Sequence, residues 1–272
     1  MTLRREVAAR LQAAGVPSPD ADAAALIAFV AGSRAFDPRL DAEQQQQLEA
    51  LVVRRCAREP LQHLTGVAGF RYLDIEVGPG VFVPRPETEV LVDVALQEPF
   101  ESAIDLCTGS GAIALALATE AGAKVTGVEM QEQAFAWAQR NAKGRIALLR
   151  ADVCQPLDLS PVDLVVSNPP YIPQAMVPRD PEVAKHDPKL ALYGGEDGMQ
   201  VIRCVVARAR ELLKAGGRLL IEHGEHQAPD VRALLGGFEQ VQTWQDLTGR
   251  DRVTGGRYVF PGRAAESLRY SN

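Results

Sequence analysis

The sequence is poor in cysteine and in aromatic residues, and it contains no long apolar run. Aromatic residues make up 6% of the 272 positions, and only 4 residues are cysteine. No two cysteines form a C-x-x-C pair, and this wide spacing predicts neither a zinc site nor a disulfide framework. No apolar run reaches about 18 residues, the length that a membrane-spanning helix needs. Since residues 1–10 are charged and lack a signal-peptide core, we expect a cytoplasmic protein.

A basic excess is also missing. The net charge is −6 at pH 7, which argues against a surface that wraps nucleic acid. Hydrophobic residues make up 46% and charged residues 24%, as is typical of a globular protein. The length suits one large domain or two smaller ones.

Residues 1–60 show only helical spacing. Ser18-Pro19 opens a helix with proline in its first turn. Asp41 begins another, because its side chain can cap the helix while Gln44 answers from three residues further on. We predict a small helical bundle over residues 1–60, followed by a hairpin or connector over residues 61–83.

Strands and helices alternate along residues 84–262, which predicts an α/β domain with a mostly parallel, Rossmann-like sheet covered on both faces. Two late strands, near 238–245 and 256–261, follow one another without a long helix. This pairing predicts an antiparallel strand at the sheet's edge, and residues 263–272 are expected to form a tail. The earlier strands are expected near 102–107, 124–129, 145–150, 162–167 and 217–222, and the helices near 111–121, 131–142, 198–214 and 227–235.

The motif Asn168-Pro169-Pro170-Tyr171 follows an apolar, β-branched run over residues 162–167. Proline lacks an N–H and fixes φ, so the strand must end there and turn at its carboxyl end, where open α/β sheets bind ligands. The Asn168 oxygen and the Pro169 carbonyl can both accept hydrogen bonds from a planar –NH₂ group. Tyr171 can stack on the flat face of that group. The motif therefore predicts a clamp for an amide or amino nitrogen.

A glycine-containing turn, Cys107-Thr108-Gly109-Ser110-Gly111, separates the strand that carries Asp105 from an alanine-rich helix. Glycine lets the backbone approach a ligand closely, and a helix N-terminus offers N–H groups without partners. No third glycine completes a dinucleotide fingerprint.

Carboxylates follow the first three strands. Glu129 ends the second strand and can accept hydrogen bonds from both hydroxyls of a ribose. Asp152 or its neighbour Val153 can meet an adenine amino group. With Asp105 these residues form an acidic pocket that disfavours pyrophosphate and suits the cationic S-adenosylmethionine.

Several motifs in order resemble the HemK/PrmC family of protein-(glutamine-N5) methyltransferases. The similarity runs from about residue 60 to residue 260. The matching stretches are 59–66 (EPLQHLTG), 83–89 (VPRPETE), 105–111 (DLCTGSG), 167–172 (SNPPYI) and 190–198 (LALYGGEDG).

The resemblance implies a methyltransferase sheet preceded by a helical domain that helps to grip a peptide chain release factor. It also implies methylation of the glutamine in that factor's Gly-Gly-Gln motif, which supports translation termination. Cys107 stands where the family commonly has glycine, and Glu129 where it commonly has aspartate. The expected cofactor-binding residues are Phe82, Asp105, Cys107, Thr108, Gly109, Ser110, Gly111, Glu129, Asp152, Val153 and Asn168.

We expect catalysis to depend on positioning, because an amide nitrogen is a poor nucleophile. Asn168 and Pro169 would accept the two amide N–H bonds, and Tyr171 would pack against the amide or hold the loop. The expected catalytic residues are Asn168, Pro169 and Tyr171; Pro170 and Arg85 join them in substrate binding. Residues 172–198 are expected to cover the site, and no metal is expected. His223 and His226 are expected to have surface or capping roles.

Three alternatives remain open at this point. The same clamp could serve a nucleic-acid methyltransferase acting on adenine N6 or guanine N2, although the net charge counts against it. The chain could bind S-adenosylmethionine without catalysis, or could modify another protein, such as a ribosomal protein glutamine. A monomer is favoured.

Overall fold

The structure, a computed structural model, describes residues 2–33, 35, 38–178 and 180–259. It divides into two compact units. Unit 1 comprises Met1–Val67, Val77–Pro79 and Pro178–Asp187, and unit 2 comprises Ala68–Glu76, Gly80–Val177 and Pro188–Asn272. The expected tail, 263–272, lies outside the described residues.

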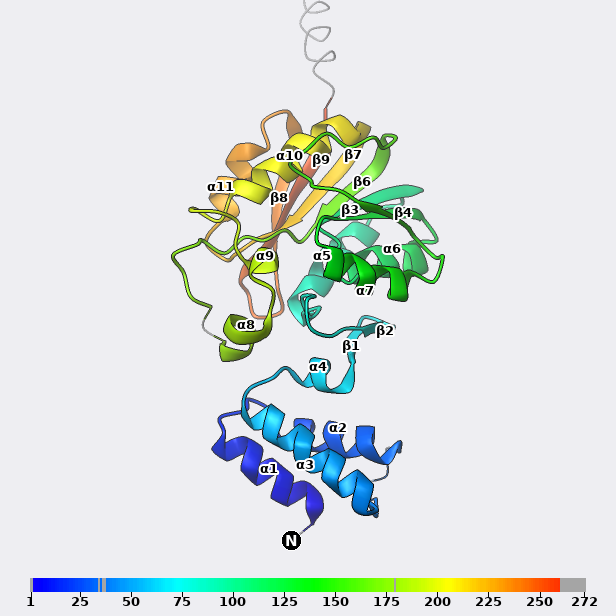
Figure 1. Ribbon diagram of the computed structural model, residues 1–272. Coiled ribbons are helices and arrows are strands. Elements are labelled where there is room, and N and C mark those ends of the chain that lie inside the picture. Colours follow the sequence, from blue (N-terminus) through cyan, green and yellow to red (C-terminus); the bar gives the residue numbers. More distant parts are fainter. Residues whose placement is uncertain (1, 34, 36–37, 179, 260–272) are drawn as a thin grey trace, which may run out of the picture. The chain divides into compact units, whose positions relative to one another are not determined.

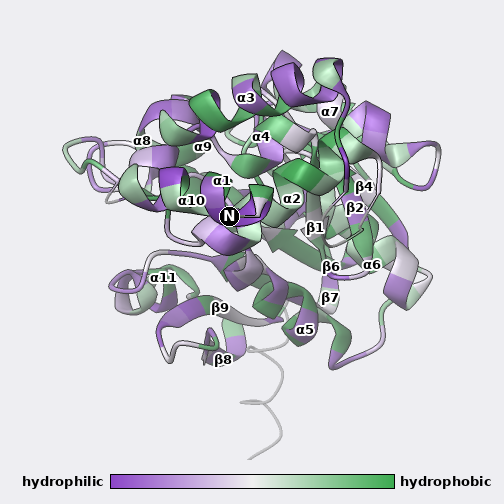
Figure 2. Ribbon diagram, turned by 90° about the horizontal axis from the view of Figure 1, so that it is seen from below, coloured by the Kyte–Doolittle hydropathy of each residue, from purple (hydrophilic) through white to green (hydrophobic). Residues whose placement is uncertain are grey.

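Unit 1 contains the helices α1 (Leu3–Ala13), α2 (Pro19–Ala31), α3 (Ala42–Cys56), α4 (Leu61–Thr65) and α8 (Pro181–His186). The predicted cap of α3 is confirmed: Asp41 Oδ1 accepts from Gln44 N at 2.9 Å, and Gln44 Oε1 accepts from Asp41 N at 3.0 Å. Buried side chains of α1, α2 and α3, among them Leu11, Leu26 and Val52, form its core. The apolar character of α2 appears as green ribbon in Figure 2.

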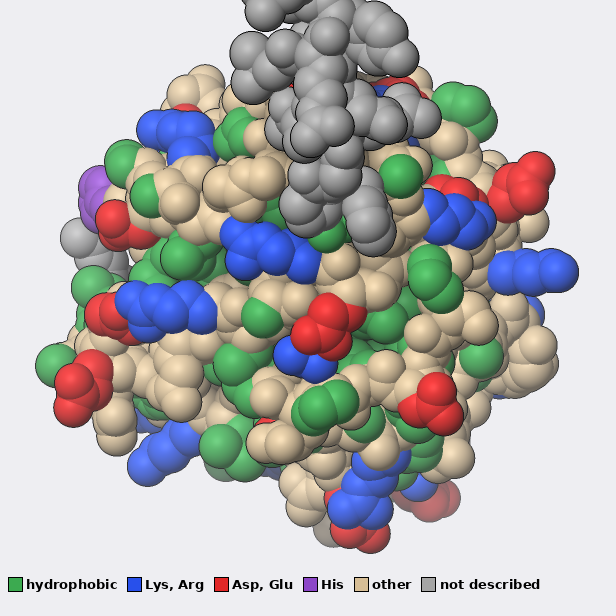
Figure 3. Space-filling model, turned by 90° about the horizontal axis from the view of Figure 1, so that it is seen from above, with side chains coloured by type: hydrophobic (Ala, Val, Ile, Leu, Met, Phe, Trp, Pro, Cys, Tyr) green, Lys and Arg blue, Asp and Glu red, His purple; other side chains and the backbone are tan. Residues whose placement is uncertain are grey.

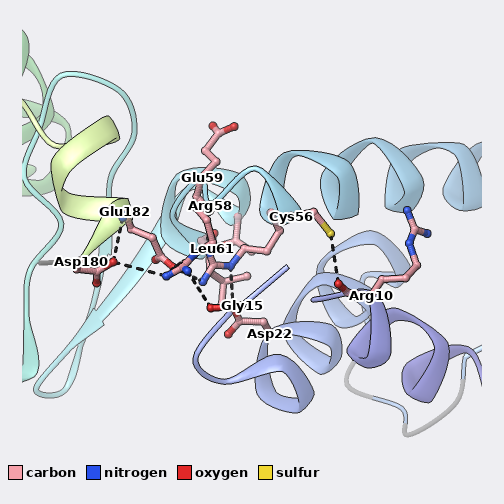
Figure 4. A network of polar contacts seen from close by, with 11 residues as sticks. Arg10, Gly15, Asp22, Cys56, Arg58, Glu59, Leu61, Asp180 and Glu182 are labelled. Atoms are coloured by element: carbon pink, nitrogen blue, oxygen red, sulfur yellow. Dashed lines mark hydrogen bonds and ion pairs between the residues drawn. The ribbon is translucent and has the colours of Figure 1, made fainter. Parts of the chain in front are cut away.

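A buried arginine joins α8 to α3 inside unit 1. Arg55 is 3% exposed; its Nε donates to Asp22 Oδ2 and its Nη2 to Glu182 Oε1, both at 2.7 Å. Arg58 adds a contact from its Nε to Glu182 Oε1 at 3.1 Å, and its Nη1 donates to Gly15 O at 2.8 Å. Figure 4 shows Arg58, Glu182 and Asp180 turned toward one another. Residues 178–187 therefore belong to the helical unit, although they lie more than a hundred residues from α3 (separation 127 for Arg55 and Glu182).

Unit 2 is built on a sheet whose strand order is β5-β4-β3-β6-β7-β9-β8 in the described residues. The pairs β3–β4, β3–β6, β4–β5 and β6–β7 are parallel, and β9 is antiparallel to both β7 and β8. The α/β class and the mostly parallel sheet are confirmed (Figure 1). The antiparallel strand lies one position in from the edge, because β9 inserts between β7 and β8. The strands are β3 (Ser102–Leu106), β4 (Lys124–Glu129), β5 (Ala147–Arg150), β6 (Val162–Ser167), β7 (Leu213–Glu222), β8 (Phe238–Gln245) and β9 (Asp251–Tyr258).

Helices pack on this sheet in groups: α5 contacts α6, and α10 contacts α11. The side chains of β3, β6, β7, α10 and α11 share one buried apolar cluster. A two-stranded sheet of β1 and β2 precedes the large one along the chain. The bounds are β1 (Val67–Phe70), β2 (Leu73–Glu76), the 3₁₀ helix η1 (Pro86–Thr88), α5 (Glu89–Leu96), α6 (Ala112–Ala121), α7 (Glu132–Ala142), α9 (Lys189–Leu192), α10 (Gln200–Leu212) and α11 (Ala228–Leu234).

The expectation of no disulfide is wrong. Cys154, in the loop after β5, is bonded to Cys204 of α10, with the two Cα atoms 4.9 Å apart. Cys56 and Cys107 are free. The spacing of the cysteines along the chain could not predict this pair, because the two residues are 50 positions apart. They become neighbours only when the folded sheet brings α10 beside the loop after β5. Within the described residues, none of the helices has both the length and the hydropathy to span a membrane.

Candidate functional site

The carboxyl ends of β4, β3 and β6 meet at one edge of the sheet. Leu106 is in register with Val128 on one side and with Ser167 on the other. The residues that follow these strands are therefore neighbours, and Ser167 Oγ donates to Leu106 O at 2.6 Å. After β3 the chain adds β4 and β5 on one side of that strand and then β6 and β7 on its other side. The strand order thus reverses at β3, and α/β sheets bind their ligands at such a switch point.

The turn after β3 has the backbone shape that a close ligand contact requires. Cys107, Gly109 and Gly111 have φ values of 63°, 57° and 84°. A Cβ added to Gly109 would meet no atom within 4 Å, so open space lies beside this backbone. Thr108 N donates to Val128 O at 2.9 Å and ties the turn to β4. Cys107 adopts a left-handed conformation that glycine reaches more easily.

Asp105 is fully buried and holds this turn. Its Oδ2 accepts from Thr108 Oγ1 and from Ala114 N, the latter at 3.2 Å. Burial raises the pKa of Asp105 to about 7, although those two hydrogen bonds lower it. Its Oδ1 has no hydrogen-bond partner among the described residues. A buried carboxylate oxygen without a partner suits a cationic ligand.

Glu129 ends β4 with both carboxylate oxygens bound to backbone N–H groups. Its Oε2 accepts from Gly109 N at 2.9 Å, and its Oε1 accepts from Gln131 N at 2.8 Å. Burial raises its pKa, and the backbone hydrogen bonds oppose this. Glu129 is thus fixed beside the glycine turn, and each oxygen keeps a second lone pair for a ligand hydroxyl.

Asp152 and Val153 follow β5. The Oδ1 of Asp152 accepts from Cys154 N at 2.8 Å. Val153 is 5% exposed and packs in the core, so its backbone rather than its side chain is what a ligand could reach. The disulfide at Cys154 fixes this loop to α10.

The side chain of Asn168 is oriented by a residue of the 83–89 stretch. Asn168 Nδ2 donates to Thr88 Oγ1 at 3.2 Å. Thr88 is 4% exposed and ends η1. In this bond the Asn168 amide nitrogen is the donor, so Oδ1 remains the acceptor of the side chain.

The loop after Asn168 is held by the glycines at 194 and 198. Gly194 N donates to Ile172 O at 2.9 Å. A Cβ on Gly194 would lie 2.4 Å from Pro170 O, and a Cβ on Gly198 would lie 2.3 Å from Tyr171 O. Only glycine permits this close backbone packing, so the Gly-Gly-x-x-Gly stretch shapes the Asn-Pro-Pro-Tyr turn.

Tyr171 lies largely within the protein. Burial is the main cause of its raised pKa, and the charge of Glu222 acts in the same direction. Gln227 Nε2 donates to Tyr171 O at 2.9 Å, and Gln227 Oε1 accepts from Gly224 N at 2.8 Å. The segment after β7 therefore also holds the turn at Tyr171 in place.

Two further placements concern predicted residues. The Arg85 guanidinium lies 5.1 Å from the centre of the Phe82 ring, as a cation–π contact. The surface role expected for His223 is wrong, since its side chain is fully buried and its Nε2 lies 2.7 Å from Thr254 Oγ1. His223 directly follows the buried end of β7 and is buried with it. The spacing between His223 and His226 in the sequence carries no information on this burial.

Asn141 of α7 is a site residue that the sequence analysis missed. Its Nδ2 donates to Ser110 O at 3.0 Å and to Glu76 O at 2.9 Å, while its Oδ1 accepts from Glu76 N at 2.8 Å. It thus ties the glycine turn to β2. A single asparagine near the end of an alanine-containing helix does not by itself indicate a functional residue in the sequence.

The sheet order, the glycine turn and the acidic strand ends define a class I methyltransferase. Residues 2–66 match the PrmC N-terminal domain, and residues 73–180 match the methyltransferase small domain. A methyltransferase from Pyrococcus furiosus shares the fold, with a TM-score of 0.55 at 17% identity over 81% of this chain and 100% of that one.

The chain belongs to the release factor glutamine methyltransferase family. It is 44% identical to the release factor glutamine methyltransferase of Streptomyces coelicolor, over 93% of this chain and 95% of that protein. It is 49% identical to the one from Mycolicibacterium smegmatis, over 90% of this chain and 92% of that protein.

Proposed function

We propose that this chain transfers the methyl group of S-adenosylmethionine to the side-chain amide nitrogen of the glutamine in the Gly-Gly-Gln motif of peptide chain release factors. The observation that carries the proposal is the orientation of Asn168, whose Nδ2 donates to Thr88 Oγ1. Family membership supplies the substrate class, since relatives that match nearly the whole chain are release factor glutamine methyltransferases.

The residues fit S-adenosylmethionine. The open space beside Gly109 and the unpartnered Oδ1 of Asp105 give room and negative charge for its amino acid part. Glu129 would take the ribose hydroxyls, and the 152–153 segment would meet the adenine, with Phe82 as a wall. When bound, the cofactor supplies an electrophilic sulfonium methyl group.

The protein's part in the chemistry is to hold the amide. Asn168 Oδ1 and the Pro169 carbonyl would each accept one N–H bond of the substrate amide, and Tyr171 would hold the loop. The nitrogen would then be held toward the methyl group, so that the N–C bond could form as the S–C bond of the sulfonium breaks and leaves a neutral thioether. One amide proton would be lost to water. Positioning of this kind supplies most of the rate.

In this proposal unit 1 and Arg85 bind the release factor. The protein acts in the cytoplasm, and it acts as a monomer. Nucleic acid is the less favoured of the candidate substrates. The net charge is −6, and on the face in Figure 3 the described Lys and Arg side chains are interspersed with Asp and Glu. Nucleic-acid enzymes normally gather basic side chains into one footprint.

The test is peptide mass spectrometry of unmodified release factor incubated with the protein and S-adenosylmethionine. We expect one added methyl on the Gly-Gly-Gln glutamine, and a loss of about 10³-fold in kcat for Asn168→Ala. Calorimetry should show that this variant still binds the cofactor. Undiminished transfer by Asn168→Ala, or methylation of DNA, RNA or a ribosomal protein in place of the release factor, would contradict the proposal.

A further inference from the structure

The chain that follows the Asn-Pro-Pro-Tyr turn leaves unit 2 and later returns to it. Residues up to Val177 belong to unit 2, the crossing segment Pro178–Asp187 belongs to unit 1, and the chain re-enters unit 2 at Pro188. A chain that passes twice between two compact units can restrain one of them through the other, because its backbone has a limited reach. The crossing segment has no role in methyl transfer as proposed above.

The two ends of the loop that carries the crossing segment are paired with each other in unit 2. Gly194 N donates to Ile172 O at 2.9 Å, and Gln174 N donates to Gly195 O at 2.9 Å. Ile172 directly follows Tyr171. A displacement of either end of this loop therefore acts on the residue next to the Asn-Pro-Pro-Tyr turn.

The crossing segment is fixed in unit 1 by the carboxylate of Glu182, which is 9% exposed (Figure 4). Its Oε1 accepts from Arg55 Nη2 at 2.7 Å and from Arg58 Nε at 3.1 Å. Both guanidinium groups are also held by the helical bundle, through Asp22 Oδ2 at 2.7 Å and Gly15 O at 2.8 Å. Charge-assisted hydrogen bonds from arginine have defined directions, so they give the carboxylate one position in unit 1.

The backbone around Glu182 is shaped to present this carboxylate. Asp180 Oδ1 accepts from Glu182 N at 2.9 Å and caps α8, which has Pro181 in its first turn. Arg58 Nη2 lies 3.6 Å from Asp180 Oδ1. A buried ion pair adds little stability over apolar packing, and its best-attested use is to specify one arrangement. The anchor is therefore suited to fixing the place of the crossing segment.

We propose that Glu182 is a positioning residue: it anchors the crossing segment on the unit that binds the release factor, and it thereby restrains the turn that binds the glutamine amide. Docking of the release factor on unit 1 is in this way coupled, through the chain, to the geometry of the amide clamp. The inference rests on the proposed function for its kinetic consequence, whereas the restraint on the turn exists without substrate.

Asp22 offers a matched control. It is 7% exposed and binds the same arginine, Arg55, but it belongs to α2 and not to the crossing segment. Asp22→Asn and Glu182→Gln each remove one buried negative charge beside one guanidinium, so both variants should destabilise unit 1. Only Glu182→Gln weakens the attachment of the crossing segment.

The kinetic test compares these two variants with the wild type. Glu182→Gln should lower kcat for release factor methylation about 10-fold, because a small misplacement of positioning groups is costly to the rate. Asp22→Asn should keep kcat within about 2-fold, and both variants should bind S-adenosylmethionine as the wild type does. Equal losses of kcat in the two variants, or a loss confined to KM for the release factor, would overturn the proposal.

Hydrogen exchange tests the restraint without substrate, with each variant kept well below its melting temperature. The N–H groups of Ile172, Gln174 and Gly194 should exchange at least about 5-fold faster in Glu182→Gln than in the wild type, and at wild-type rates in Asp22→Asn. Unchanged exchange at these three sites in Glu182→Gln would refute the coupling. Failure of the wild-type protein to methylate release factor would refute only the proposed function.

Discussion

At the scale of single residues, the site depends on polar groups that are buried before any ligand arrives. Asp105, Glu129 and Glu222 lie within the protein, and burial raises the pKa of each carboxyl. Their ionised forms are therefore costly, and a cationic cofactor beside Asp105 and Glu129 would offset part of that cost. The site trades stability for the ability to hold a cation and orient an amide.

Glu222 gives a pH-dependent prediction for stability. Its pKa rises from 4.5 in the unfolded chain to about 7 in the folded protein, so between these values the folded state binds more protons. The contribution of Glu222 to stability therefore falls as pH rises through this window. Glu222→Gln should gain stability relative to wild type between pH 4.5 and pH 8, by about 3 kcal/mol.

Chemical denaturation at the two pH values measures this difference. The matched control is Glu225→Gln, which removes the same charge from an exposed position on the same segment. A wild-type-minus-variant difference that stays constant with pH would contradict the assignment.

At the scale of elements, backbone packing between two loops shapes the clamp. Gly198 has a φ of 74° and lies against Tyr171 O, whereas Gly122 has a φ of 66° at the end of α6 with no atom within 4 Å of an added Cβ. Both glycines have left-handed conformations, and only one has a close neighbour.

Gly198→Ala should thus do more damage than Gly122→Ala. We expect both variants to lose about 1 kcal/mol from backbone strain, and Gly198→Ala to lose in addition at least 10-fold in kcat as the Tyr171 carbonyl is displaced. Thermal melts and methyl-transfer assays on the two variants separate these effects. Equal kcat values would mean that the 194–198 loop does not set the clamp.

The ion pairs of α3 give a second prediction at this scale. Arg55 is buried between Asp22 and Glu182, whereas its neighbour Arg54 pairs with Glu59 at a half-exposed position. Arg55→Met leaves the buried Asp22 without its partner and Glu182 with Arg58 alone, and it should cost about 3–5 kcal/mol. Arg54→Met should cost at most about 1 kcal/mol. Denaturant unfolding compares the two; similar costs would show that the Arg55 cluster is not desolvated.

At the scale of the whole molecule, contacts between distant segments complete each unit. The Cys154–Cys204 disulfide closes a loop of 50 residues. A crosslink restricts the unfolded chain, so its reduction should lower the free energy of unfolding by about 2–4 kcal/mol. Reductant should have no such effect on Cys204→Ser. A wild-type protein that is equally stable with and without reductant would show that the two thiols are not paired in solution, as a reducing cytoplasm would favour.

Local signals in the chain were enough for much of the fold and of the site. The prolines after Asn168 force a turn, the β-branched run before them forms β6, and the Asp41–Gln44 pair caps α3 as expected. Strand–helix alternation predicted the parallel sheet, whose strand ends bring Asp105, Glu129 and Asn168 to one edge. These features follow from short-range sterics and periodicity, so they are readable from the sequence.

What the sequence by itself determined, then, is the succession of strands and helices along the chain, the parallel character of most of the sheet and the turn after β6. The tertiary structure alone decided which distant groups support them: Thr88 beside Asn168, Asn141 beside the glycine turn, Glu182 on Arg55 and Cys204 on Cys154. Each of these pairs joins segments that are dozens of residues apart, and nothing in local propensity marks them. They arise because burial removes water, and a polar group without water must find its partner wherever the folded chain supplies one.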